Sequence, residues 1–467
     1  MQPIRANILC RGLGQVEGDP VVTAVVTDNR AAGPGSLFVC IRGARADGHD
    51  YAAKAVQAGA CAVVAQHPVQ GVPSGRCVLV QNPLDAMIRM GANYRAGFSP
   101  VLVGVTGSVG KTTTKEFCYA VFSAFGKTLK TEGNQNNEIG MPNTLFRLDG
   151  TTRYAVVEMG MQGLGEIEKL TLAARPCGAI ITCIGQSHLE QLGTRENILK
   201  AKMEICAGLP DGAPLIVNAD NDLLSHAQVP ARLRRVSFGI EADADVRAKG
   251  ISTGPNGTDF TILDKQRGEF AAYIPAMGVH NVYDALSSWA LAVSLGLDAR
   301  KAAQALAHYK TTGHRQNIVQ FRGLTMLEDC YNASPDSMRA ALDILTRRTP
   351  GPGGRRIAVL GDMLELGQAS EQAHRQTGEA AAAAADLVIA VGPLSAALAE
   401  AARSRGTKTL YCQSIGEVVE YLRLNLCCGD VVLAKASHAM QFEQMLNDLY
   451  AVLPAPAAST EPDRSTT

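Results

Sequence analysis

Residues 104–117 read GVTGSVGKTTTKEF, and they begin inside a short apolar run, VLVGVT at 101–106. Pro100 and Gly107 bound this run, which predicts a buried strand. The glycines and the serine that follow are small enough for backbone N–H groups to converge on phosphate oxygens. A helix that begins at Lys111 would add its positive N-terminal end. The stretch therefore predicts a strand, a polyphosphate-binding loop and a helix in succession.

The polar side chains of this loop have the chemistry that a nucleoside polyphosphate requires. Lys111 can reach the β- and γ-phosphates, and the Thr112 hydroxyl can bind Mg²⁺. Val105 stands where the pattern GxxxxGK[ST] has its first glycine, so the stretch is a variant of that pattern. The predicted phosphate-binding residues are Gly107, Ser108, Val109, Gly110, Lys111, Thr112 and Thr113.

Strand-like and helical patterns alternate on the C-terminal side of the loop. The runs YAVVEM, CGAIITCIG and APLIVNAD are separated by helical segments, which predicts a mainly parallel sheet with helices on both faces. Residues 231–278 indicate short strands and turns, and a helical pattern then ends at Gly296. The later runs LTMLED, RRIAVLGD, DLVIAVG and DVVLAKAS predict a second doubly wound, Rossmann-like unit.

These patterns predict an α/β protein of three domains. Residues 1–97 form a small α/β domain, 98–312 a central phosphate-loop ATPase domain, and 313–454 the Rossmann-like domain. Residues 455–467 are rich in Pro, Ser and Thr, which is typical of a disordered tail.

Composition narrows the class of protein. Lys+Arg and Asp+Glu both total 44 among 467 residues, so the charge balance favours neither a nucleic-acid partner nor a membrane surface. No uninterrupted apolar segment is long enough to span a membrane, and the N-terminus lacks the pattern of a secretory signal. The 12 cysteines are scattered, as expected of reduced thiols. We expect a cytoplasmic monomer without membrane insertion or a nucleic-acid partner.

Three further residues suggest a metal site beside the loop. Glu158 ends a strand-like run, His188 follows another, and Lys202 lies on the next predicted helix. Taken alone, His188 is more often structural and Lys202 a solvated lysine. A desolvated lysine near cations can instead react with CO₂ and become a carbamate, an oxygen ligand that suits Mg²⁺. We hypothesise two Mg²⁺ ions bridged by Glu158, one completed by Thr112 and the other by His188 and carbamylated Lys202.

The chain resembles the Mur ligase family, whose members add amino acids to the bacterial cell-wall precursor. The resemblance covers about 28–450 and rests on motifs in the family's order and spacing: TGSVGKTTTKE, TEGNQNNEIGMP, VVEMG, GQSHLEQLGTRENILKAKMEI, HNVYDAL and EDCYNASPDSM. NQNNEIGMPNTL (134–145) and DCYNASPDSMRAALDIL (329–345), joined by VLGDMLELG (359–367), are similar to the member that adds a dipeptide.

The resemblance implies an ATP-dependent ligase in peptidoglycan precursor synthesis, with ATP and Mg²⁺ as cofactors. Its substrates would be UDP-N-acetylmuramoyl-tripeptide and D-alanyl-D-alanine, joined through an acyl phosphate. The first domain would bind the UDP end, the second ATP and metal, and the third the dipeptide.

The resemblance also implies roles for individual residues. The catalytic set would be Lys111, Glu158, His188, Lys202 and Arg315. Asn281 would contact adenine, while Asp329 would contact ribose or another part of the nucleotide. Asn134, Asn136 and Asn137 would face the sugar-peptide substrate, and Asn29, Arg30 and His49 would hold the UDP end.

The sequence departs from the family pattern at several of these places. Asn29 stands where Ser is usual, Asp284 replaces a second Asn, and GHRQ replaces the commoner Gly-Arg around Arg315. Ala436 and His438 replace the Gly and Arg of a later motif.

Three alternatives remain at this stage. A guanine-binding switch would need Asn-Lys-x-Asp, but VNADND has Ala219 at the Lys position. A ligase that adds glutamate to folate has no module like residues 28–51. A neighbouring Mur ligase that adds a single amino acid is the strongest competitor, and substrate selectivity would separate it from the dipeptide ligase.

Overall fold

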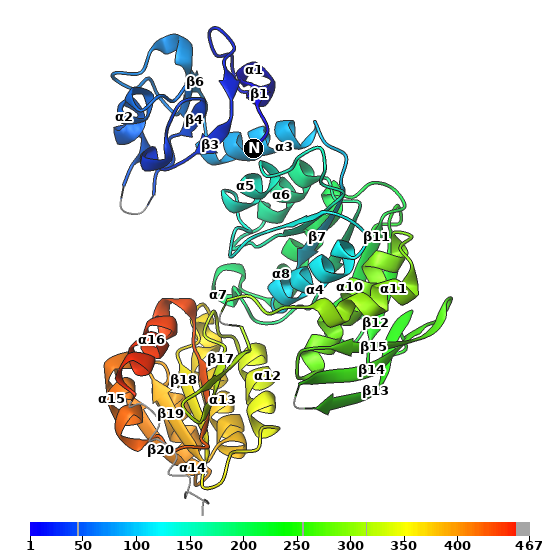
Figure 1. The fold of residues 1–467 in the computed structure, drawn as a ribbon, viewed down its shortest axis with the longest axis vertical. Helices are drawn as coiled ribbons and strands as arrows, with labels where there is room; N and C mark the ends of the chain where they lie inside the picture. The colour runs from blue at the N-terminus through cyan, green and yellow to red at the C-terminus, as the bar shows by residue number, and fades with distance from the viewer. Residues whose placement is uncertain (44–45, 255, 314, 454–467) are drawn as a thin grey trace, which may run out of the picture. The chain divides into compact units, whose positions relative to one another are not determined.

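The computed structural model describes residues 1–43, 46–254, 256–313 and 315–453, and the predicted tail at 455–467 lies outside them. The chain divides into two compact units. Unit 1 comprises Met1–Gly185 and Gln191–Lys310, and unit 2 comprises Gln186–Glu190 and the chain from Thr311 onward. Each unit has its own sheets (Figure 1).

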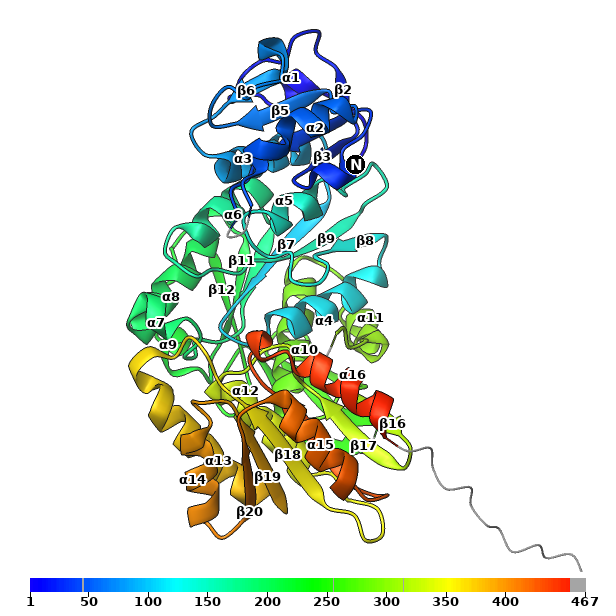
Figure 2. The same ribbon diagram turned by 90° about the vertical axis from the view of Figure 1, so that its left-hand side faces the viewer.

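Unit 1 begins with the antiparallel pair of β1 and β2, followed by a small parallel sheet in the order β3-β4-β5-β6 (Figure 2). Its helices begin at local signals: Asn82 accepts a hydrogen bond from the Leu84 N–H, and Pro83 occupies the first turn of α3. The elements are β1 (Ile4–Arg5), α1 (Ala6–Leu9), β2 (Val21–Val22), β3 (Ala24–Val26), β4 (Ser36–Val39), α2 (Ala52–Gln57), β5 (Ala62–Ala65), β6 (Cys77–Leu79) and α3 (Pro83–Arg95).

A nine-stranded sheet forms the rest of unit 1, in the order β15-β14-β13-β12-β11-β10-β7-β9-β8. The seven strands from β8 to β13 are parallel, as predicted for most of the sheet, and β14 and β15 continue it through two antiparallel pairs, β13 with β14 and β14 with β15. Its strands are β7 (Val101–Thr106), β8 (Thr128–Lys130), β9 (Tyr154–Glu158), β10 (Gly178–Ile181), β11 (Pro214–Asn218), β12 (Arg234–Gly239), β13 (Val246–Gly254), β14 (Gly257–Asp264) and β15 (Gly268–Ile274).

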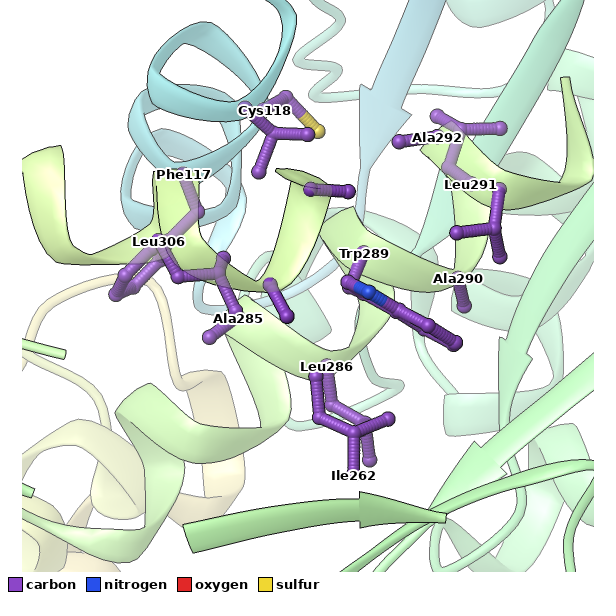
Figure 3. Close-up of a cluster of buried hydrophobic side chains, with 14 of the residues drawn as sticks. Phe117, Cys118, Ile262, Ala285, Leu286, Trp289, Ala290, Leu291, Ala292 and Leu306 are labelled. Atoms are coloured by element: carbon purple, nitrogen blue, oxygen red, sulfur yellow. The ribbon is translucent and has the colours of Figure 1, made fainter. Parts of the chain in front are cut away.

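The core of this larger domain forms where two helices pack together on the sheet. Trp289 is fully buried there, and its indole N–H donates to the Ala299 carbonyl at 2.9 Å (Figure 3). Phe117 of the neighbouring helix stacks on Tyr309 with ring centres 3.9 Å apart. The helices are α4 (Lys111–Ser123), α5 (Gly140–Leu145), α6 (Glu166–Ala174), α8 (Arg195–Met203), α9 (Asp222–Ser225), α10 (Val279–Ser294) and α11 (Ala299–Ala305).

Unit 2 contains a six-stranded sheet in the order β16-β17-β21-β18-β19-β20, parallel except for the edge strand β16. One apolar core lies under α12, α13 and α14, and another lies under α15 and α16, which confirms the predicted doubly wound arrangement. The elements are β16 (Asn317–Phe321), β17 (Leu324–Glu328), α12 (Pro335–Thr346), β18 (Arg356–Gly361), α13 (Ser370–Ala384), β19 (Leu387–Val391), α14 (Ala396–Ser404), β20 (Lys408–Cys412), α15 (Ile415–Asn425), β21 (Val431–Lys435) and α16 (Phe442–Val452).

Within the described parts of the chain, no helix has the length and apolar character needed to cross a membrane. All twelve cysteines are free thiols.

Candidate active site

The phosphate-binding loop has the conformation that its small residues allow. It connects β7 to α4, and Gly107 and Gly110 adopt φ values of 151° and 83°. A Cβ atom on Gly107 would lie 1.9 Å from Thr182 Oγ1, so a larger residue would collide with the neighbouring segment. That threonine hydroxyl donates to the Val109 carbonyl at 2.5 Å and fixes the loop from behind. The Lys111 ammonium donates to the carbonyls of Gly107 and Ser108 at 2.8 and 3.1 Å, so it lies over the loop.

The Glu158 carboxylate lies beside the loop at the end of β9, and only 1% of its surface is exposed. One oxygen accepts a hydrogen bond from Thr112 Oγ1 at 2.8 Å, and the other accepts one from Asn136 Nδ2 at 2.8 Å. The structure thus brings together the hydroxyl and the carboxylate that the sequence predicted as Mg²⁺ ligands. Hard oxygen donors of this kind suit Mg²⁺.

Sequence reasoning missed a buried charge network behind Glu158. Lys115 Nζ lies 3.1 Å from Glu116 Oε1 and 4.0 Å from Glu158 Oε2. Lys130 pairs with the other oxygen of Glu116 and lies over the Tyr119 ring. Buried charges are costly unless they are paired, so this network balances the carboxylates beside the loop. The signal in the sequence was a Lys-Glu pair directly before the mostly apolar run FCYAVF of the same helix.

Lys202 is fully buried on α8, where the isolated residue would have been expected in solvent. Its ammonium has no hydrogen-bond partner within the described parts of the chain. Burial lowers the pKa of Lys202 well below its usual value, and the positive charge of Lys111 acts in the same direction. Cys183, Glu158 and Glu166 oppose this shift of the Lys202 pKa. An orphaned, easily deprotonated amine is the group that carbamate formation requires.

His188 belongs to unit 2, although the sequence grouped it with the central domain. It lies beside α7 (Leu189–Leu192), and its Nδ1 is 2.9 Å from Glu365 Oε2. Both residues adopt a left-handed φ of 63°. Burial and the charge of Glu190 raise the pKa of Glu365.

The backbone around Glu365 is held by buried polar side chains of unit 2. His374 Nε2 accepts the Met363 N–H at 3.0 Å, and Ser437 Oγ accepts the Leu364 N–H at 2.9 Å. Among the described residues, no group of three or more His, Cys, Asp or Glu side chains could hold a metal ion.

Asp329 and Arg315, both in unit 2, lie near the carboxyl end of β17. Asp329 accepts from Lys435 Nζ at 2.8 Å and from the Gln316 N–H at 3.3 Å. The Arg315 guanidinium lies 3.6 Å from the centre of the Tyr331 ring. Ligands of open parallel sheets bind at this end of the strands.

The predicted adenine contact, Asn281, is buried near the start of α10. Its amide nitrogen donates to the Met277 carbonyl at 2.6 Å and lies 3.2 Å from His280 Nε2.

The three predicted sugar-peptide contacts differ in their surroundings. Asn136 is committed to Glu158, whereas Asn137 Oδ1 accepts the N–H groups of Ile139 and Gly140 at the start of α5. Asn134 is exposed, and its carbonyl accepts the Asn136 N–H at 2.8 Å.

The predicted UDP contacts lie in the small domain. His49 is buried, its Nδ1 lies 2.6 Å from Asp47 Oδ1, and its Nε2 accepts the Gln66 N–H at 3.0 Å. Both ring nitrogens of His49 are therefore occupied by contacts within the small domain. Arg30 is exposed and paired with Asp28, which lowers the pKa of that carboxyl to about 2. Asn29 is half-buried and lies beside Arg30 in the same short turn.

Family comparisons agree with this geometry over almost the whole chain. The description "Mur ligase family, catalytic domain" matches residues 21–108, "Mur ligase middle domain" matches 105–292, and "Mur ligase, glutamate ligase domain" matches 314–438.

Similar proteins from several bacteria carry the name UDP-N-acetylmuramoyl-tripeptide–D-alanyl-D-alanine ligase. The protein from Bacillus subtilis (strain 168) is 37% identical over 434 residues, with 92% of this chain and 93% of the relative covered. The protein from Escherichia coli (strain K12) is 39% identical over 396 residues, with 83% and 85% covered.

Solved structures give the same result. MurF from Acinetobacter baumannii has a TM-score of 0.87 at 29% identity and covers 97% of this chain and 99% of its own. MurF ligase from Thermotoga maritima, in complex with ADP, has a TM-score of 0.81 at 28% identity, with 96% and 99% covered. The chain belongs to the Mur ligase family.

Proposed function

We propose that this protein is an ATP-dependent ligase that joins D-alanyl-D-alanine to UDP-N-acetylmuramoyl-tripeptide in peptidoglycan precursor synthesis. The observation that carries the proposal is its similarity, over nine-tenths of both chains, to a relative of that name. The phosphate loop beside the Thr112–Glu158 pair supplies the ATP chemistry. We assign the UDP end to residues 1–97, ATP to 98–312 and the dipeptide to 313–454.

In the first step, the γ-phosphoryl group leaves ATP and bonds to an oxygen of the tripeptide's terminal carboxylate, releasing ADP. The loop N–H groups and Lys111 hold the phosphates, and Arg315 neutralises charge on the moving group. Thr112 and Glu158 would hold Mg²⁺, which when bound stabilises the developing phosphate charge. Asn281 and Asp329 would orient the nucleotide, and Asn134, Asn136 and Asn137 would orient the peptide.

In the second step, the amine of the dipeptide attacks the carbonyl carbon of the acyl phosphate. The new C–N bond forms, phosphate leaves with the electrons of the C–O bond, and the amine releases a proton. Asn29, Arg30 and His49 lie in the domain assigned to the UDP end, where His49 supports the fold rather than offering a ring nitrogen.

We further propose that Lys202 is carbamylated and, with His188, supplies ligands to a second Mg²⁺ ion. The buried, unpartnered amine supports this assignment, because carbamylation would turn an unfavourable lysine into a metal-bound carboxylate. The Glu365 carboxylate at His188 Nδ1 is the kind of partner that orients a metal-bound imidazole. We place the reaction in the cytoplasm, where ATP and UDP-linked precursors are available, and expect the enzyme to act as a monomer.

The test is phosphate release from ATP in the presence of UDP-N-acetylmuramoyl-tripeptide, with D-alanyl-D-alanine compared against single amino acids. Release that depends on the dipeptide, together with the mass of the joined product, is expected. Release with a single amino acid would retain the ligase chemistry and assign the protein to a neighbouring step of the same synthesis.

A further inference from the structure

Asp284 lies directly behind the phosphate loop and has no part in the reaction described above. It is on α10, only 7% of it is exposed, and its Oδ1 accepts a hydrogen bond from Thr114 Oγ1 of α4 at 2.8 Å. A Cβ atom on Gly110 would lie 2.6 Å from the same oxygen. The carboxyl group therefore lies against the backbone of the loop, on the side that faces α10.

In the described parts of the chain, the surroundings of this acid are uncharged. Within the described parts of the chain, no Lys, Arg or His side chain lies within 4.0 Å of its carboxyl oxygens. The groups that face it are the Thr114 hydroxyl and Gly110 from the loop and α4. Deeper between the two helices, the thiol of Cys118 donates to Ser288, whose hydroxyl in turn donates to the Asp284 carbonyl. Burial raises the pKa of Asp284 to about 7.

We propose that Asp284 is a positioning residue of the nucleotide site: it supports the phosphate loop as a neutral carboxylic acid, and its ionisation weakens nucleotide binding. This inference rests on the proposed nucleotide site. The loop's N–H dipoles are directed at the phosphates, and a carboxylate behind Gly110 would draw on the same dipoles and repel the same anion. Binding to the ionised protein therefore adds one proton from solvent to the carboxylate, and no other bond changes.

The experiment is calorimetric titration of the full-length protein with ADP at saturating Mg²⁺, between about pH 6 and about pH 9. If only the protonated form binds, the dissociation constant rises about 50-fold from about pH 7 to about pH 9. Asp284→Asn keeps the shape of the side chain without its charge, so its affinity is expected to vary much less. Titrations in buffers of different ionisation enthalpy measure how many protons the protein takes up when ADP binds. The wild type is expected to take up more protons than Asp284→Asn. Asp298→Asn, whose carboxylate caps α11, is the matched control and should retain the wild-type profile.

Parallel pH profiles and equal proton uptake in the wild type and Asp284→Asn would overturn the inference. Thr114→Val provides a second test, because the lost hydrogen bond stabilises the ionised carboxyl. That variant is expected to bind ADP with a pH profile displaced to higher pH, and an unchanged profile would also contradict the inference. Failure of the wild type to bind ADP at any pH would instead refute the proposed nucleotide site itself.

Discussion

Replacing Lys202 by methionine should abolish ligation and yet stabilise the protein. The ammonium is completely buried without a hydrogen-bond partner, and its stem occupies core volume that methionine can fill. A buried donor left unsatisfied costs about 1–3 kcal/mol of folding free energy. In buffer free of bicarbonate, Lys202→Met should therefore unfold with a free energy about 1–3 kcal/mol larger than the wild type. A gain near the middle of that range corresponds to a rise of about 4–8 °C in Tm for a domain of this size.

The pH dependence of this difference follows from the direction of the Lys202 pKa shift. The folded protein holds the amine with a lowered pKa, so the unfolded chain binds more protons in the pH range between that lowered pKa and the ordinary lysine pKa of about 10.4. Wild-type stability should therefore rise as pH increases toward that value. The advantage of Lys202→Met should be largest below the lowered pKa and should shrink as the pH rises toward about 10.4.

The assay uses urea unfolding followed by tryptophan fluorescence. The chain has a single tryptophan, Trp289, buried in the core of the domain that holds Lys202, so its emission reports the relevant transition. Lys200→Met on the same helix is the matched control, and because Lys200 is exposed it should change stability by less than about 0.5 kcal/mol. A methionine variant less stable than the wild type near neutral pH, or a difference that does not vary with pH, would refute the reasoning.

Three other changes test the site and the core. Lys111→Ala should lose ATP turnover, because the β- and γ-phosphates lose their cation. Calorimetry should show that this variant still binds UDP-N-acetylmuramoyl-tripeptide. Loss of both ATP turnover and substrate binding would indicate misfolding or wrong domain assignments. Lys202→Ala should lose ligation and recover part of it when formate or acetate supplies the missing carboxylate, and full activity without added acid would contradict the carbamate. Trp289→Ala should reduce the free energy of unfolding by about 3–5 kcal/mol, because it leaves a cavity between α10 and the sheet. Circular dichroism in urea measures this change. A loss below about 1 kcal/mol would show that neighbouring core residues fill the cavity.

Local sequence signals predicted most of the secondary structure because each depends on neighbours along the chain. The predicted strand at 101–106 is β7, and the helix expected from Lys111 is α4. The helical pattern that ends at Gly296 is α10 followed by its cap. The edge strand β20 escaped prediction because its residues are only partly buried and its apolar pattern is weak. The strands in 231–278 are longer than expected, because antiparallel pairing of β14 with both β13 and β15 extends over most of each strand.

The candidate site could be predicted only where a local sequence motif indicates the chemical role of its residues. Thr112 and Glu158 were paired from the phosphate-loop pattern, and they are in contact. The neighbours of Asp284 lie 170 residues away in the sequence, so no local pattern could reveal them. The same holds for Glu365, which approaches His188 from a distant loop.

The short passage of residues 186–190 through unit 2 has a consequence for how such proteins can evolve. The chain enters unit 2 for this segment, returns to unit 1, and enters unit 2 again at Thr311. Recombination at residue 310 would join a foreign C-terminal unit to the original segment 186–190. In this segment the His188 ring and the Glu190 N–H both contact Glu365 of the C-terminal unit. A successful exchange would have to carry matching sequences at two separate places.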